Sequence, residues 1–193
     1  MDVFTVLKNV IRHNLLEMIK TILICLLLLM AKVSLGQEKS NLSNAEIFSS
    51  KAGTLIEKEF LDIGQINKTT EIKILKITDM ISGDSIKSMR ITTEIPGSYS
   101  TETKIAQLDS DEIDGLIKSI LIIKENVLNT NAENYTEITF KSRSGFEAGC
   151  YWSKNEWKTY LQIEKYDRKS MVWFRGDEFE MFFELLNKAK VKM

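Results

Sequence analysis

The chain has 193 residues, and its 26 lysine and arginine residues nearly balance 27 aspartate and glutamate residues. This length fits a leader segment and one ordinary domain, and the balanced charge favours neither nucleic acid nor an anionic membrane surface as a partner. A single histidine and two cysteines leave little material for histidine-based catalysis, a histidine metal site or a disulfide framework.

The N-terminal segment has the features of a secretory signal peptide. Its apolar run, residues 19–31, is too short for a bilayer span, which needs about 20 residues. Positive charges precede the run, and small residues occupy the positions that a signal peptidase reads before Gln37. We therefore predict a signal peptide over residues 1–36, cleaved between Gly36 and Gln37; the alternative is an uncleaved membrane anchor.

Cleavage there would change the chemistry available to the protein. His13 and Cys25 both lie in the removed segment, so the mature chain keeps only Cys150 and no histidine. That composition excludes a Ser-His-Asp or Cys-His nucleophile, a histidine metal site and an intramolecular disulfide. We expect a periplasmic or extracellular protein without a membrane span, a buried and inert Cys150, and translation from either Met1 or Met18.

The rest of the chain is expected to be a polar tether followed by one globular domain. Residues 37–52 are polar, whereas residues 53–193 contain short apolar runs separated by turn residues, a pattern typical of strands. Two segments, 109–127 and 177–191, instead place apolar residues at helical spacing. The domain is therefore predicted to contain both strands and helices.

A constant offset relates the two halves of this domain. It places Leu108 on Phe174 and Ile113 on Phe179, and it also aligns the strands that come before each helix. We predict an α+β fold of two tandem ββββα units, over residues 53–128 and 133–193. Their strands are expected at 54–62, 70–80, 87–95 and 102–108, and at 134–143, 146–153, 157–165 and 170–175.

Two-residue turns at 154–155 and 167–168 would give the second unit a self-consistent strand register. The expected pairs are Trp152 with Trp157, Ala148 with Leu161, Ile163 with Val172, and Leu161 with Phe174. All of these side chains then lie on one face of the sheet, and a slip of one residue would move them all to the other face. The predicted core contains Trp152, Trp157, Leu161, Phe174, Phe182 and Phe183.

The chain shows two resemblances. The tandem plan of four strands and a helix resembles the whirly and Pur-alpha folds, which implies single-stranded nucleic-acid binding, although the likeness is one of topology alone. The segments FSSKAGT (48–54), KITD (76–79), SGFEAGC (144–150) and EKYD (164–167) resemble small exported, uncharacterised proteins of Bacteroidota. The second resemblance implies an exported bacterial protein and no particular activity.

An acidic run over residues 109–115 invites comparison with a calcium loop. An EF-hand needs oxygen ligands at positions 5 and 12, where this chain has Ile113 and Ile120. We therefore predict a capped helix start, with Asp109 and Glu112 as the capping pair, and no metal site or cofactor. The chain also lacks a glycine-rich phosphate loop, a nucleophile elbow and a Ser-x-x-Lys motif, so no catalytic residues are predicted.

The register that buries Trp152 and Trp157 turns a second set of residues to the opposite face of the sheet. We predict a binding surface there, made by Tyr151, Tyr160, Trp173, Lys158 and Gln162, because exposed aromatic side chains stack on sugars, bases or partner side chains. The alternative is that this face packs against the first unit.

These observations favour an exported, non-catalytic binding module of the bacterial cell envelope, with an envelope protein or a glycan as its partner. A single-stranded nucleic-acid binder is the first alternative, but the outer strands mix positive and negative residues where a phosphate-binding surface would be basic. The second alternative is a carboxylate-based hydrolase, for which the sequence singles out no pair of acids.

Overall fold

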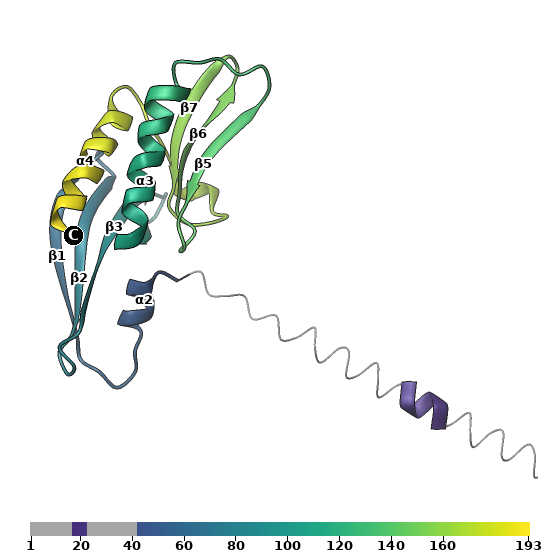
Figure 1. The fold of residues 1–193 in the computed structure, drawn as a ribbon, viewed down its shortest axis with the longest axis vertical. Helices are drawn as coiled ribbons and strands as arrows, with labels where there is room; N and C mark the ends of the chain where they lie inside the picture. The colour runs from purple at the N-terminus through teal and green to yellow at the C-terminus, as the bar shows by residue number, and fades with distance from the viewer. Residues whose placement is uncertain (1–16, 23–41) are drawn as a thin grey trace, which may run out of the picture. The chain divides into compact units, whose positions relative to one another are not determined.

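The computed structural model describes residues 17–22 and 42–193 (Figure 1). The chain divides into two compact segments, Met1–Ser40 and Asn41–Met193, and the domain described below is the segment Asn41–Met193. Residues 17–22 are helical and exposed. The rest of the predicted signal peptide and its cleavage point lie outside the described residues. No helix in the described ranges combines the length and the apolar character that a membrane crossing requires.

The first half of the domain is a four-stranded antiparallel sheet followed by a helix. Its strands lie side by side in chain order, which is the arrangement that short turns between successive strands produce. Helix α3, Ser110–Ile122, follows directly and continues as a π-helical turn, Ile123–Val127. The strands of this first sheet are β1 (Ile56–Gln65), β2 (Thr70–Asp79), β3 (Ser85–Pro96) and β4 (Thr101–Asp109).

The second half repeats this order of elements with shorter strands. A second antiparallel sheet, again in chain order, precedes helix α4, Glu178–Lys192. The predicted α+β fold of two tandem ββββα units is therefore confirmed. The strands of this second sheet are β5 (Thr136–Lys141), β6 (Glu147–Ser153), β7 (Glu156–Gln162) and β8 (Met171–Trp173).

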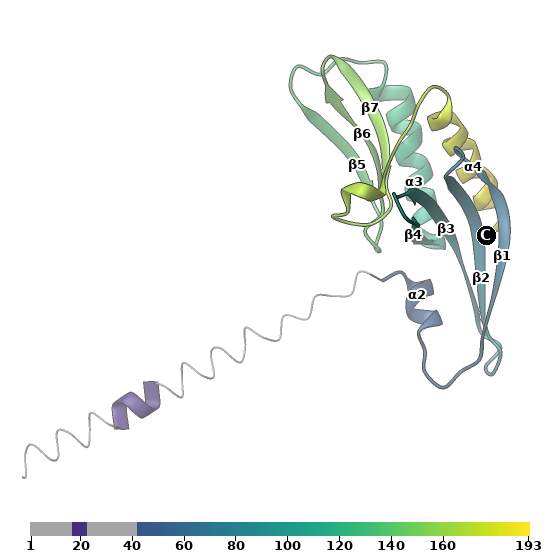
Figure 2. The same cartoon turned by 180° about the vertical axis from the view of Figure 1, so that it is seen from behind.

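The two helices lie side by side and join the two sheets (Figures 1 and 2). Helix α3 contacts β3 and β4 of the first sheet and also β5 and β6 of the second, whereas α4 packs on β1 and β2. The helix of the second unit thus lies on the sheet of the first. One continuous core results, with buried members from both sheets and both helices, among them Ile72, Leu108, Leu116, Leu161 and Phe182.

The predicted register is correct for one strand pair of the second sheet and shifted for the next. Trp152 pairs with Trp157 and Ala148 with Leu161, as expected. Leu161, however, pairs with Val172, so the predicted Ile163–Val172 and Leu161–Phe174 pairs are wrong by two residues. A shift of two keeps every side chain on its predicted face.

The shift arises because the connection from β7 to β8 is longer than a two-residue turn. It contains a 3-10 helix, Arg168–Ser170, and Tyr166 with a positive φ of 64°. The Ser170 hydroxyl holds this connection together: it accepts from the Glu164 N–H at 3.0 Å and lies 2.7 Å from the Asp167 carbonyl oxygen. The predicted turn at residues 167–168 is therefore replaced by a compact loop.

The predicted polar tether over residues 37–52 needs a correction, because part of it is folded. Helix α2, Asn44–Ser49, buries Ala45 against Leu75 and Ile77 on the face of the first sheet opposite the helices. A capping box begins this helix, since Ser43 and Glu46 satisfy each other's backbone N–H groups at 2.7 and 3.1 Å. A short segment with a buried alanine and a capped start is a docked element.

The predicted aromatic core is confirmed in part. Trp152, Leu161 and Phe182 are buried, whereas Trp157, Phe174 and Phe183 are only partly buried and pack against the edge of the core. Cys150 is fully buried, as expected, and burial raises the pKa of its thiol to about 12. A thiol with that pKa is protonated at neutral pH and is a poor nucleophile.

Candidate functional site

Four aromatic side chains gather on the outer face of the second sheet, the face turned away from the core. Tyr151 lies at the centre, with ring centroids 5.8 to 6.3 Å from those of Trp173, Tyr135 and Tyr160. Tyr160 and Trp173 are themselves 5.9 Å apart. We refer to these four residues as the aromatic cluster. Three of them, Tyr151, Tyr160 and Trp173, are predicted binding residues that the structure brings together.

Strand pairing explains how the cluster assembles. Tyr160 on β7 pairs with Trp173 on β8 and with Gly149 on β6, so the Tyr160 side chain has an aromatic neighbour on one side and a bare backbone on the other. Its hydroxyl lies 3.0 Å from the Thr139 hydroxyl across that glycine. Period-two alternation along the strands therefore places these side chains on one face.

The four rings differ in exposure. Tyr160 is only 6% exposed and is held between its neighbours, and this burial raises the pKa of its phenol. Tyr135 and Trp173 are 66% and 43% exposed, and Tyr151 is intermediate. Tyr160 is thus the buried member of the cluster, and the other three rings form the part of the cluster that is accessible to solvent.

The first unit does not cover this face, so the predicted alternative of an internal interface is not what the structure shows. At the edge of this face, Met171 and Trp173 of β8 border a groove of about 440 Å³. The opposite wall of the groove is formed by Thr69 before β2 and by the end of β3 at Pro96. The aromatic cluster is open to a partner.

Two ion pairs lie beside the cluster. Lys158, which lies opposite Tyr151 on the neighbouring strand, contacts Glu156 at 3.1 Å. On the β5 side, Lys141 contacts Glu147 at 2.8 Å. The surface therefore has an aromatic centre and a rim of ion pairs.

The remaining predicted residue and one missed residue complete the surface. Gln162 lies on β7 opposite Glu147 and Met171, at the edge of the cluster. Tyr135 was not predicted, because the predicted register did not extend to the first strand of this sheet. It lies just before β5 and takes no part in a strand pair. Its hydroxyl donates to the Glu137 carboxylate, which raises the pKa of Tyr135 to about 12.

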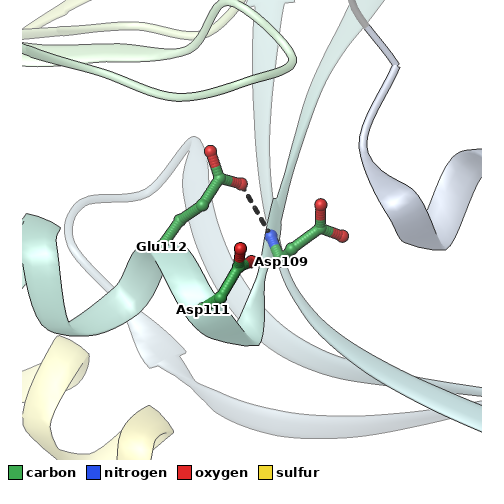
Figure 3. A group of neighbouring side chains, drawn as sticks. All are labelled: Asp109, Asp111 and Glu112. Carbon is green, nitrogen blue, oxygen red and sulfur yellow. Dashed lines mark hydrogen bonds between the residues drawn. The ribbon is translucent and has the colours of Figure 1, made fainter.

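The acidic residues at the start of α3 form a second group with site-like geometry (Figure 3). Carboxylate oxygens of Asp109, Asp111 and Glu112 lie within 4.8 Å of one another. The Asp109 N–H donates to Glu112 Oε2 at 3.0 Å, the capping bond that the sequence predicts and that Figure 3 draws as a dashed line. This group lies where β4 meets α3, far from the aromatic cluster along the chain.

Protein groups already occupy these three carboxylates. Arg143, in the turn between β5 and β6, contacts Asp109 and Asp111 through its guanidinium, and its backbone N–H donates to Glu112 at 2.5 Å. Asp109 also accepts N–H groups from the first residues of α2, Asn44 at 2.7 Å and Ala45 at 3.1 Å. The cluster is therefore a structural junction between three segments of the chain.

Comparisons of the chain with protein-family models, with curated proteins and with solved structures find no match. The function is accordingly argued from the chemistry of the surface itself.

Proposed function

We propose that the protein is an exported, non-catalytic binding module of the bacterial cell envelope, and that it docks a protein partner on the aromatic cluster. The observation that carries this proposal is the anatomy of the outer face, with three accessible rings at its centre and paired charges around it. Protein interfaces share this anatomy, because tyrosine and tryptophan concentrate at their centres while the polar rim stays accessible to water.

The orientation of the rings supports a protein partner. Their planes are inclined to one another by 42° to 74°, so the cluster offers ridges and gaps between Tyr135, Tyr151 and Trp173. An uneven surface of this kind is complementary to side chains of mixed size. Consecutive stacked bases, by contrast, favour rings presented along a strand-like track.

The charges around the cluster argue against nucleic acid. Binding to a phosphate backbone gains free energy from lysine and arginine side chains that neutralise phosphates. Lys141 and Lys158 already have carboxylate partners, at 2.8 and 3.1 Å, so each would lose an ion pair in order to contact a phosphate. The mixed rim suits a partner with charged groups of both signs.

A paired variant tests this function. The chain beginning at Gln37 is used to capture partners from detergent-solubilised envelope, and the affinity of the purified partner is then measured by calorimetry. Tyr151→Ala combined with Trp173→Ala should weaken binding by about 100-fold or more, since interface hot spots each contribute about 2 kcal/mol. The melting temperature should change little, because both side chains are partly exposed.

The matched control replaces two exposed rings outside the cluster, Phe60 and Tyr99, with alanine. That control should bind the partner as tightly as the parent protein. Equal affinity of both double variants would remove the aromatic cluster as the docking surface. Tight binding of a single-stranded DNA oligonucleotide at low salt, without any protein partner, would replace the proposal with its nucleic-acid alternative.

A further inference from the structure

A second cavity, of about 420 Å³, lies at the end of the second sheet that is nearest the C-terminus of α3. Three connections meet there: the turn from β6 to β7, the loop from α3 to β5, and the turn that leads into α4 at Gly176. The cavity opens on the inner face of the sheet, so the aromatic cluster on the outer face takes no part in it. It is a separate candidate site.

The floor of the cavity is a pair of tryptophans. Trp152 and Trp157 pair across β6 and β7, with ring centroids 5.4 Å apart and planes inclined at 60°. The Trp157 indole N–H donates to the Thr130 carbonyl oxygen at 2.8 Å, which fixes the ring and holds the α3–β5 loop beside it. Trp157 remains partly exposed, so part of its indole faces the cavity.

Three asparagines, Asn129, Asn131 and Asn155, form the walls. All three are exposed, and within the described residues their side-chain amides make no hydrogen bond. Asn155 is placed by the two-residue turn that joins β6 to β7, in which both residues have a positive φ. These amides thus lie beside the two tryptophans, and no hydrogen bond between the described residues depends on them.

The cavity is close to electrically neutral. Among the described residues that line it there is no lysine, arginine or histidine, and the only acid is Glu156. The Glu156 carboxylate is paired with Lys158 at 3.1 Å, and Lys158 belongs to the outer face of the sheet. A charged ligand would therefore find no counter-charge here, and an entirely apolar ligand would leave the amides unpaired.

We infer that this cavity binds a neutral saccharide. The weakly polarised C–H groups on the face of a sugar ring pack on the electron-rich face of an indole, here that of Trp157. A sugar hydroxyl is both a donor and an acceptor, and so is each asparagine amide, which carries two N–H donors and a carbonyl oxygen. An aromatic floor with uncharged amides around it matches both surfaces of such a ligand.

The Trp152–Trp157 pair also stabilises its hairpin, as cross-strand aromatic pairs do. That role accounts for the two rings but not for the three amides, which make no hydrogen bond to any residue that the structure describes. The amides therefore give a way of testing ligand binding without disturbing the hairpin.

The test uses tryptophan fluorescence and calorimetry on the mature chain carrying Trp173→Phe. This background leaves Trp152 and Trp157 as its tryptophans, because the chain has three. The probes are the neutral tetrasaccharides cellotetraose, laminaritetraose, maltotetraose and chitotetraose, with tetragalacturonate as the charged comparison. At least one neutral probe should give a saturable blue shift, and tetragalacturonate should bind more weakly.

Variants then assign the binding to the cavity. Asn129→Ala combined with Asn131→Ala should weaken the affinity about tenfold, the loss expected for one or two hydrogen bonds. Asn126→Ala combined with Asn134→Ala is the matched control, since both residues are exposed asparagines outside the cavity lining. Trp157→Ala should abolish binding, and the amide variant remains decisive if that change also loosens the hairpin.

Three results would each overturn the inference. One is the absence of a saturable fluorescence change with all four neutral probes. Another is tighter binding of tetragalacturonate than of any neutral probe. The third is an unchanged affinity in the double asparagine variant. None of them bears on protein docking at the aromatic cluster, because that docking is measured on the chain that keeps Trp173.

Discussion

Gly149 lies at the centre of the second sheet, between Thr139 on β5 and Tyr160 on β7. A Cβ atom added there would collide with the Ile138 backbone carbonyl oxygen and come within 3.0 Å of the Thr139 Cα atom. Neither atom can move without disturbing the β5–β6 hydrogen bonds. We therefore expect Gly149→Ala to lower the free energy of unfolding by about 2 kcal/mol or more, measured by urea denaturation.

Gly115 provides the matched control, because the same substitution should have the opposite effect there. This glycine lies in α3, and an added Cβ would meet only the Phe140 ring, at an ordinary contact distance of 3.5 Å. Alanine is the better helix former by about 1 kcal/mol. Gly115→Ala should thus raise the urea midpoint, and a shift of both variants in one direction would contradict the steric account of Gly149.

At the scale of whole elements, the junction between α2, α3 and the β5–β6 turn depends on Arg143. Its guanidinium contacts Asp109, whose side chain is only 3% exposed, and lies 2.8 Å from Asp111. The hydrogen bond from Arg143 is the main reason that the pKa of Asp111 is lowered. Loss of Arg143 would leave the buried carboxylate of Asp109 with backbone N–H groups as its remaining partners.

We expect Arg143→Ala to cost a modest part of the free energy of unfolding, measured by urea denaturation. This is less than the loss of a fully buried partner, because the guanidinium is 39% exposed and screened by water. Hydrogen exchange should also accelerate at the Asn44 and Ala45 amides, which donate to Asp109. Arg168→Ala, at an exposed arginine of the β7–β8 connection, should change neither quantity, and equal effects of the two variants would argue against the junction.

Sequence patterns predicted the strands, the two long helices and the faces of the strands, because period-two and period-3.6 alternation are local properties of the chain. They missed α2, although Ser43 and Glu46 have the spacing of a capping box just before Ile47 and Phe48. A helix of six residues carries too little periodicity to stand out from a polar segment. Its docking on the first sheet is a long-range contact that no local pattern encodes.

The limits of prediction at the two sites have the same physical origin. Alternation placed Tyr151, Tyr160 and Trp173 on one face, but it could not show that Tyr160 is covered by its neighbours. It also assigned Trp157 to the core, since it could not locate the α3–β5 loop that leaves room for a cavity beside this residue. The exposure of a side chain and the presence of a cavity depend on tertiary packing, and strand periodicity carries no information about tertiary packing.

For the molecule as a whole, one lysine joins the edge of the first sheet to the second unit. Lys104 on β4 is only 12% exposed along its side chain and contacts Glu102 on its own strand at 2.6 Å. It also contacts two carboxylates of the β7–β8 connection, Asp167 at 2.8 Å and Glu164 at 3.1 Å. Because this network and the packing of α4 on the first sheet both link the two units, we expect them to unfold together.

The Lys104 network should make stability depend on pH in a defined direction. The hydrogen bond from Lys104 is the main cause that lowers the pKa of Asp167, and hydrogen bonds from Asp167, Glu102 and Glu164 raise the pKa of Lys104. A carboxyl group whose pKa is lowered by folding stabilises the protein above its unfolded pKa of about 3.9, and that contribution is lost as the pH falls through the folded value. A lysine whose pKa is raised stabilises the protein below its unfolded pKa of about 10.4, and that contribution is lost as the pH rises through the folded value. The network is therefore at full strength between about pH 4 and pH 10.

Lys104→Met tests this dependence, because methionine keeps much of the side-chain volume and removes the charge. At pH 7 the variant leaves three neighbouring carboxylates facing one another without their cation, so its melting temperature should fall below that of the parent. The difference should shrink as the pH is lowered below about 4, since protonation removes both the attraction in the parent and the repulsion in the variant. Lys118→Met, at an exposed lysine of α3, should have the same melting temperature as the parent at every pH. A difference between Lys104→Met and the parent that stays constant from pH 7 to pH 3 would show that Lys104 acts through packing of its aliphatic chain, and that the ion network does not hold the units together.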